Sequence, residues 1–206
     1  MKSAKEIALD SKLISALKDI SPSGKAAEVM RLLLQDEEIQ AMQEYANIVS
    51  IKRLQYNDHG PVHMRTAALN SIKMMGLLKK ANIKTSLEKE ECGTFEDSLS
   101  AVILASFLHD LGMSISRQDH ELHSAYLSYP LINRILQTVY PRDYQKQATI
   151  RSLAIEGISG HMAGRTIHSL EAGIILVADG CDMQKGRARI PISLAHAPRV
   201  GDIHQY

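Results

Sequence analysis

Apolar residues crowd most densely between residues 100 and 112, in the run Ser-Ala-Val-Ile-Leu-Ala-Ser-Phe-Leu-His-Asp-Leu-Gly. The run is too short to span a bilayer, and its continuous apolar character is typical of a buried core helix. It ends in His109 and Asp110, and Gly112 suits a left-handed cap that ends the helix. A carboxylate buried at that point needs a cation, a metal or many donors. The alternative is that His109 and Asp110 only cap the helix.

Helical periodicity before this run predicts amphipathic helices over residues 4–20 and 26–34, and another that opens with the acidic residues 36–38. The Ser-Pro-Ser-Gly segment at 21–24 separates the first two helices. Pro61 fits the first turn of a further helix, with Asn57, Asp58 or Gly60 as its cap. The polar segment 81–98 is expected to be a solvated loop leading into the central helix.

After Gly112, apolar periodicity predicts helical structure over residues 125–135, with Pro130 starting a separate helix that stops before Pro141. Two more helices are expected over residues 143–159 and 169–182, the latter with Ser169 as its N-cap. From residue 185 the chain becomes basic and rich in proline, which indicates an extended tail. The pattern as a whole predicts an all-α fold.

Composition narrows the class of protein. The chain has 206 residues, enough for one good-sized domain, of which 45% are hydrophobic and 23% charged, with a formal net charge of +1. This balance argues against nucleic acid or a membrane as the main partner. The two cysteines have no metal-ligand spacing, and the N-terminus lacks the apolar core of a signal peptide. We therefore expect a cytoplasmic location.

Candidate metal ligands occur near the ends of separate predicted helices. His63 lies in the first turn after Pro61, where the helix dipole favours a neutral, ligating imidazole. Asp179 follows an apolar stretch at a position where the periodicity predicts a core residue, and Asp182 shares its face. His120 and His123 share a face of the next segment, and His161 ends another helix. Imidazoles and carboxylates without thiolates suit Mn, Fe, Co or Ni, with Mg as an option.

The order of these residues resembles the HD superfamily of metal-dependent phosphohydrolases over residues 55 to 185. The resemblance rests on His63, then His109-Asp110 followed by Leu111-Gly112, then Asp179 at the end of an apolar helix. It implies an HD-domain-like helical bundle in which these four ligands bind one divalent metal. The implied organisation is an N-terminal helical segment (1–50) packed on an HD-type metal-binding domain (51–185), followed by an irregular tail (186–206).

In the two-metal members of that superfamily, two further histidines lie between the His-Asp pair and the last Asp. His123 and His161 match those positions in order, with His120 and His168 as their competitors. The resemblance therefore implies one or two divalent ions. It also implies that Asp110 and His109 take part in catalysis.

The implied activity is hydrolysis of a phosphate mono- or diester, of the nucleotide or cyclic nucleotide class, by metal-activated water. Asp182 or His120 is a candidate to orient a ligand or shuttle a proton. Many members of the family carry Lys where this chain has Met113, and Arg where it has Thr66, with Arg65 one position away. Arg117, Lys185 and Arg187 are therefore the candidates for binding substrate phosphate.

Two other functions stay open at this point. The missing Lys and Arg suit a non-catalytic sensor that binds metal and nucleotide to regulate a partner. The basic tail suits a nucleic-acid-binding module, although the near-neutral charge weighs against it. The apolar N-terminal helices either cover the domain or pair with a second copy in a homodimer.

Overall fold

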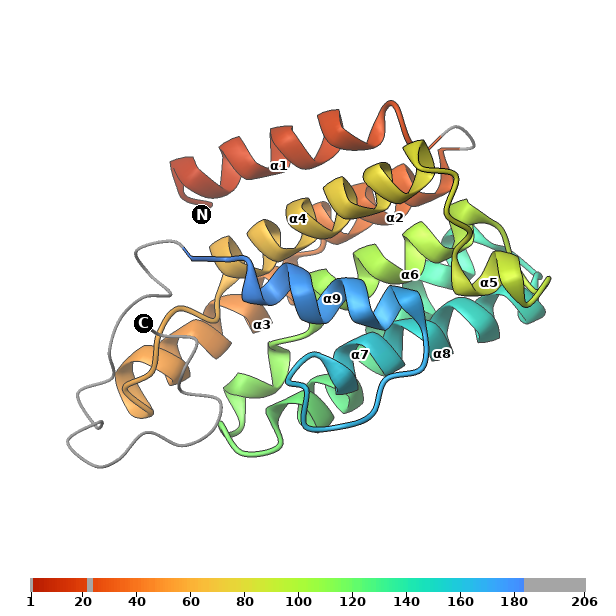
Figure 1. Ribbon diagram of the computed structural model, residues 1–206. Coiled ribbons are helices and arrows are strands. Elements are labelled where there is room, and N and C mark those ends of the chain that lie inside the picture. The colour runs from red at the N-terminus through yellow and green to blue at the C-terminus, as the bar shows by residue number, and fades with distance from the viewer. Residues whose placement is uncertain (1, 22–23, 184–206) are drawn as a thin grey trace.

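The computed structural model describes residues 2–21 and 24–183, and helices are its only regular elements over those residues. The all-α bundle that the sequence predicts is confirmed for this part of the chain (Figure 1). In chain order the elements are α1 (Ala4–Leu17), α2 (Lys25–Gln35), α3 (Glu37–Ile48), the π-helix η1 (Val49–Arg53), α4 (Pro61–Lys80), α5 (Ser86–Lys89), α6 (Phe95–Leu108), the 3-10 helix η2 (Leu111–Ser114), α7 (His120–Val139), α8 (Tyr144–Gly160) and α9 (Leu170–Gly180).

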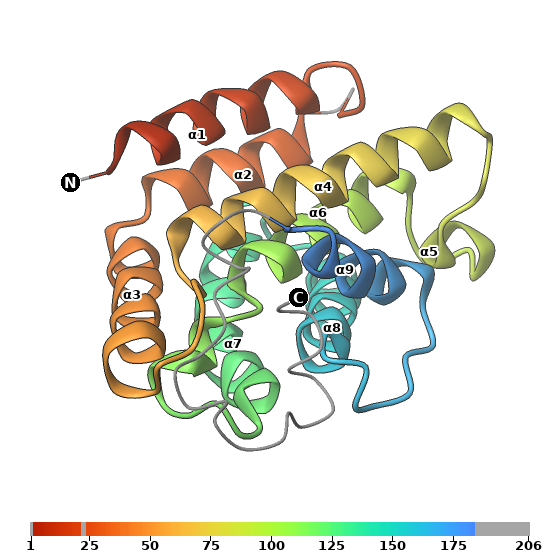
Figure 2. The same ribbon diagram turned by 60° about the vertical axis from the view of Figure 1, so that its left-hand side comes forward.

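Helix α6 forms the centre of the bundle, as its apolar run predicts. Every residue from Glu96 to Leu108 is buried. Helices α2, α4, α8 and α9 pack against it, and α1 lies outside α4 (Figure 2). A helix that is apolar on all sides gains most by burial on all sides. The C-terminal end of α6 therefore delivers His109 and Asp110 to the interior.

Local capping signals explain where the neighbouring helices begin. Asp36, Asp143 and Ser169 are N-caps whose side chains accept a bond from a backbone amide of the first turn. Pro61 occupies the first position of α4, preceded by Gly60 as the N-cap. These starts set the positions of the residues that follow, including His63 in the opening turn of α4.

Three local predictions are wrong. Pro130 does not start a helix, because it lies inside α7, where buried Leu131 and Ile132 keep the helix packed across the missing amide. Gly112 is not a left-handed cap but part of η2, and a Cβ there would lie 2.0 Å from the carbonyl oxygen of His120. Close backbone approach is thus the reason for glycine. Segment 81–98 is not one loop, because it contains α5 and the first turn of α6.

The N-terminal helices share the core of the rest of the bundle. Leu9, Leu13 and Leu17 of α1 belong to the same apolar cluster as Phe107 of α6. Within the described residues, no helix is both long and apolar enough to cross a membrane. The predicted tail (186–206), which contains Arg187, lies outside the described residues. Lys185 lies outside them too.

Candidate metal centre

Buried imidazoles and carboxylates converge at the C-terminal end of α6. They come from the first turn of α4, the end of α6, the start of η2, the first residue of α7, the C-cap of α8 and the last turn of α9. The six residues are His63, His109, Asp110, His120, His161 and Asp179. Each is at most 9% exposed. These buried groups are close enough to hold a metal ion.

One half of the cluster surrounds Oδ2 of Asp110. Nε2 of His63 and Nε2 of His109 are 3.1 Å apart, and each lies 3.2 Å from Oδ2 of Asp110. Oδ1 of Asp179 lies 3.0 Å from Nε2 of His63 and 3.7 Å from Nε2 of His109. These four residues are the ones whose order produced the resemblance to the HD superfamily.

The other half surrounds Oδ1 of the same aspartate. Nε2 of His120 and Nε2 of His161 are 3.1 Å apart. They lie 3.3 Å and 3.5 Å from Oδ1 of Asp110. Asp110 therefore stands between two sets of imidazoles, with one carboxylate oxygen directed at each set. This is the arrangement in which a carboxylate can bridge two cations.

Hydrogen bonds on the far side of each ring decide which nitrogen carries the proton. Nδ1 of His109, His120 and His161 lies 2.9, 3.0 and 2.6 Å from the carbonyl oxygens of Ser106, Arg117 and Ile158 respectively. Nδ1 of His63 lies 2.7 Å from Oδ2 of Asp182. Because these oxygens accept and cannot donate, each Nδ1 is an N–H donor. In the neutral rings, Nε2 therefore presents a lone pair to the cluster.

This donor set fits a divalent cation. Two pairs of Nε2 atoms face each other at hydrogen-bonding distance, although neutral rings place no proton between them. Oδ2 of Asp110 is buried and has no hydrogen bond of acceptable geometry. Lone pairs and negative charge thus exceed the positive charge available, which is costly in a buried site. Imidazole nitrogens and carboxylate oxygens are ligands that first-row divalent ions accept.

The excess of lone pairs and negative charge in the cluster also shifts the pKa values of its residues. Burial opposes a charge on His109, but the carboxylates of Asp110 and Asp179 outweigh it and raise the pKa of His109 to about 9. Burial likewise opposes a charge on Asp110, yet His109 and His59 hold the pKa of Asp110 well below its usual value. Burial lowers the pKa of His161. Without metal, a proton on His109 supplies part of the missing positive charge.

The structure brings His120, and not His123, into the cluster. His120 is the first residue of α7, preceded by Asp119 in the left-handed region with φ 55°. Gly112 packs against the backbone of His120, which draws that end of α7 up to Asp110. His123 is half-buried, with its Cβ beside Gly112. The other ligands all lie at helix ends, so a correct prediction of the start of α7 would have favoured His120.

The remaining candidates divide between the site and the scaffold. His161 belongs to the cluster, whereas its competitor His168 is exposed. Asp182 is buried against His63, whose ring it orients through Nδ1. Nη1 of Arg117 lies 3.3 Å from both ring nitrogens of His120, and its guanidinium lies over Tyr56 at 5.5 Å. Arg117 is thus a cation at the edge of the cluster.

Met113, at one divergent family position, and Arg65, one position from the divergent Thr66, serve the scaffold. Arg65 is 1% exposed and bonds Asp10, Gln40, Gln43 and the carbonyl of Pro61. Met113 is fully buried. Neither side chain is directed to a phosphate at the cluster. His59 is the residue whose place the sequence did not indicate: it is 3% exposed, and its ring centroid lies 6.1 Å from that of His63.

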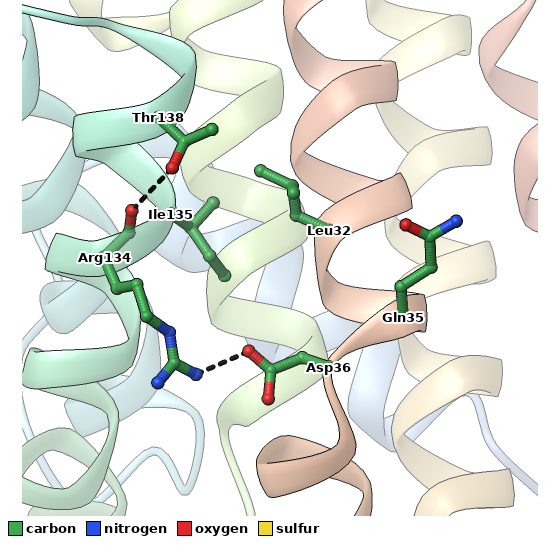
Figure 3. A pocket seen from close by; sticks show the side chains of 6 residues that line it. All are labelled: Leu32, Gln35, Asp36, Arg134, Ile135 and Thr138. Carbon is green, nitrogen blue, oxygen red and sulfur yellow. Dashed lines mark hydrogen bonds and ion pairs between the residues drawn. The ribbon is translucent and has the colours of Figure 1, made fainter.

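A separate pocket of about 310 Å³ lies between α2 and α7 (Figure 3). Leu32 and Ile135 line it, and Arg134 forms an ion pair with Asp36 beside it. No member of the metal cluster lines this pocket. The ion pair ties the α2–α3 junction to α7, so the pocket is part of the helix packing.

Comparison with known proteins identifies one informative relative. The chain is 42% identical over 172 residues to the uncharacterized protein MJ1020 of Methanocaldococcus jannaschii. The match covers 84% of this chain and 64% of the relative, so the chain spans less than two thirds of the relative's length. No protein-family model matches the chain. No solved structure gives a significant match. The chemistry of the site therefore rests on its own residues.

Proposed function

We propose that the protein is a divalent-metal-dependent phosphohydrolase of the HD type, acting on a phosphate mono- or diester. The observation that carries the proposal is the pair of facing Nε2 contacts around Asp110, each 3.1 Å long. Such contacts are unfavourable between neutral imidazoles and become favourable when a cation lies among the lone pairs. The order of the ligands along the chain supplies the resemblance to HD phosphohydrolases.

A divalent metal bound here would supply Lewis-acid chemistry, polarising a phosphate oxygen and acidifying water. The chain's own residues perform the supporting steps. Asp110 directs one oxygen to each half of the cluster and so orients both. Asp182 accepts a hydrogen bond from Nδ1–H of His63. This bond sets the tautomer and increases the basicity of Nε2. The backbone carbonyls behind the other rings perform the same orienting role.

Arg117 is the described cation best placed to bind a substrate phosphate. Its guanidinium touches the ring of His120, so an anion held by Arg117 lies beside the cluster. The guanidinium also lies over the ring of Tyr56, with its central carbon 5.5 Å from the ring centroid. The nucleotide or cyclic nucleotide class of substrate comes from the resemblance to the family. Lys185 and Arg187 remain candidates for additional phosphate contacts.

Turnover measurements with and without metal test the proposal. Metal-free protein is supplied with Mn²⁺ or Co²⁺ and assayed with a chromogenic phosphomonoester and phosphodiester, followed by nucleotides and cyclic nucleotides. We expect metal-dependent turnover in the natural chain and none above background in Asp110→Ala. His168→Gln is the matched control because His168 is exposed and outside the cluster. Equal rates in the natural chain and Asp110→Ala would contradict the proposal.

A metal- and nucleotide-binding regulator is the second candidate. The observation that favours it is the structural use of Arg65, whose guanidinium bonds Asp10, Gln40 and Gln43 and so is not available to a phosphate. A site with few phosphate contacts binds a ligand without strongly stabilising a transition state. Metal-loaded protein that binds nucleotides without hydrolysing them would support this function.

A further inference from the structure

The imidazole rings of the site form a closed circle, and His59 closes it. Successive ring centroids are 5.1 Å apart for His63–His109, 4.8 Å for His109–His161 and 5.0 Å for His161–His120. The circle returns through His59, whose centroid is 6.4 Å from His120 and 6.1 Å from His63. Each pair meets edge to face. His59 therefore lies between the two halves of the metal centre.

His59 is held in the same way as the ligands. Its Nδ1 lies 2.8 Å from the carbonyl oxygen of Asn57, just as Nδ1 of His109, His120 and His161 faces a carbonyl three residues earlier. Nδ1 therefore carries the proton and Nε2 the lone pair. The ring is 3% exposed. A histidine that only adds polarity to the protein surface would need neither this burial nor this hydrogen bond at Nδ1.

The loop that carries His59 is built around its position. The side chain of Ser50, the second residue of the π-helix η1, contacts both the Asn57 carbonyl at 2.7 Å and Nδ1 of His59 at 3.0 Å. Oδ1 of Asn47 accepts a hydrogen bond from the backbone amide of His59 at 3.3 Å. Position 60 requires glycine, because a Cβ there would lie 2.5 Å from Cβ of Asn47. Preorganisation of this kind is typical of functional side chains.

The two halves of the centre are not equally supplied with ligands. The half around Oδ2 of Asp110 has four donors, since His63, His109 and Asp179 join that oxygen. Among the described residues, ion pairs join His120 and His161 to Oδ1, which gives this half three donors. First-row divalent ions take four to six ligands. The second half therefore has the greater need for another imidazole.

We propose that His59 is the fourth protein ligand of a second divalent ion, bound with Oδ1 of Asp110, His120 and His161. This inference rests on the metal-binding part of the proposed function and specifies it further. The effect of His59 on the pKa of Asp110 is consistent with its place beside that carboxylate. The second ion would then have a nitrogen-rich ligand set, and the first ion an oxygen-richer one that includes Asp179.

Metal stoichiometry after dialysis tests the inference without reference to activity. Full-length natural protein, His59→Gln, His120→Gln and His168→Gln are loaded with Mn²⁺ or Co²⁺, dialysed and analysed for metal per chain. We expect two ions in the natural chain and in the exposed-histidine control His168→Gln. His59→Gln and His120→Gln should each retain one ion, with affinity for the second reduced at least about 10-fold. Circular dichroism confirms that each variant is folded.

Ser50→Ala gives a milder test that keeps the imidazole. The variant removes a contact to Nδ1 of His59 and should weaken the second ion while leaving the first unchanged. If His59→Gln folds and keeps both ions at unchanged affinity, the inference is wrong. A single ion in the natural chain would also overturn it while leaving the proposed function intact. No bound ion in the natural chain would contradict the proposed function itself.

Discussion

Asp110 and Glu171 are both buried carboxylates, each 1% exposed, but their surroundings differ. Oε1 of Glu171 accepts bonds from the amide of Ser86 at 3.1 Å and the hydroxyl of Ser98 at 2.6 Å. The donors include the opening amides of α5, which have no partner within their own helix. The oxygens of Asp110 instead face imidazole Nε2 atoms at 3.2 to 3.5 Å.

The difference shows which buried charge the fold satisfies by itself. Hydrogen-bond donors around Glu171 replace the water that the carboxylate loses on folding. Asp110 is surrounded by imidazoles whose Nδ1 atoms are already committed as donors, so the inner Nε2 atoms of the neutral rings are acceptors. A buried acceptor cluster of this kind is stable only with added positive charge. Glu171 therefore serves the scaffold, whereas Asp110 belongs to a cluster that could hold a metal ion.

The largest expected effect comes from Asp110→Asn. Removing the central carboxylate should abolish metal binding and with it the stabilisation that a saturating metal provides, about 2.7 kcal/mol at a metal concentration 100 times Kd. Calorimetry should show that a chelator lowers the Tm of the natural chain by about 5–10 °C. The Tm of Asp110→Asn should not respond. A chelator-sensitive Asp110→Asn would mean that the metal lies elsewhere.

Glu171→Gln should show the opposite behaviour. Loss of the charge-assisted bonds from Ser86 and Ser98 should lower the free energy of unfolding by about 1.5–3 kcal/mol. Metal per chain should stay unchanged. Urea unfolding with and without chelator measures both quantities. The exposed Glu44→Gln is the control, with an expected change within about 0.5 kcal/mol.

Asp182→Asn should separate orientation from ligation. The carbonyl oxygen of Asn can still accept a hydrogen bond from Nδ1–H of His63, but Asn carries no charge to increase the basicity of Nε2. We expect metal affinity to fall about 10-fold to 100-fold, with stoichiometry at saturation unchanged. Competition with a chromogenic chelator measures the affinity. Complete loss of an ion would indicate that Asp182 is itself a ligand.

The last expected effect, that of pH on metal affinity, is gradual and small for each tenth of a pH unit. The pKa of His109 is raised from 6.5 to about 9, so below pH 9 the metal-free ring carries an extra proton that metal must displace. Affinity for Mn²⁺ should therefore rise about tenfold per pH unit between pH 6.5 and 9. Metal-free protein should lose stability over that same window, because the bound proton stabilises the fold below the unfolded pKa. Calorimetric titration across the window checks the slope, and a flat profile would contradict it.

Much of the fold was readable from local patterns. The buried helix α6 was predicted from its continuous apolar run, and the starts of α4 and α9 from Pro61 and Ser169. Pro130 was misread because packing of Leu131 and Ile132 outweighs the missing amide bond. Local preference yields to tertiary burial when the exposed side of a helix can accept the proline ring.

Only part of the candidate site could be predicted from the sequence. His63, His109, Asp110 and Asp179 follow helix signals that the sequence displays, and the structure brings them within contact. His120 and His123 share a helix face, so spacing alone cannot choose between them. His59 lies in an irregular loop after a π-helix, where no periodicity indicates its direction.

The sequence by itself determined that the chain is helical, that α6 is buried and that a His-Asp pair ends it. Helical periodicity and capping act over a few residues, so they can be read locally. Only the tertiary structure decided which imidazoles meet around Asp110, because those contacts join residues far apart, such as His63 and His109 at a separation of 46 positions. Their meeting depends on how whole helices pack, which no short stretch of sequence encodes.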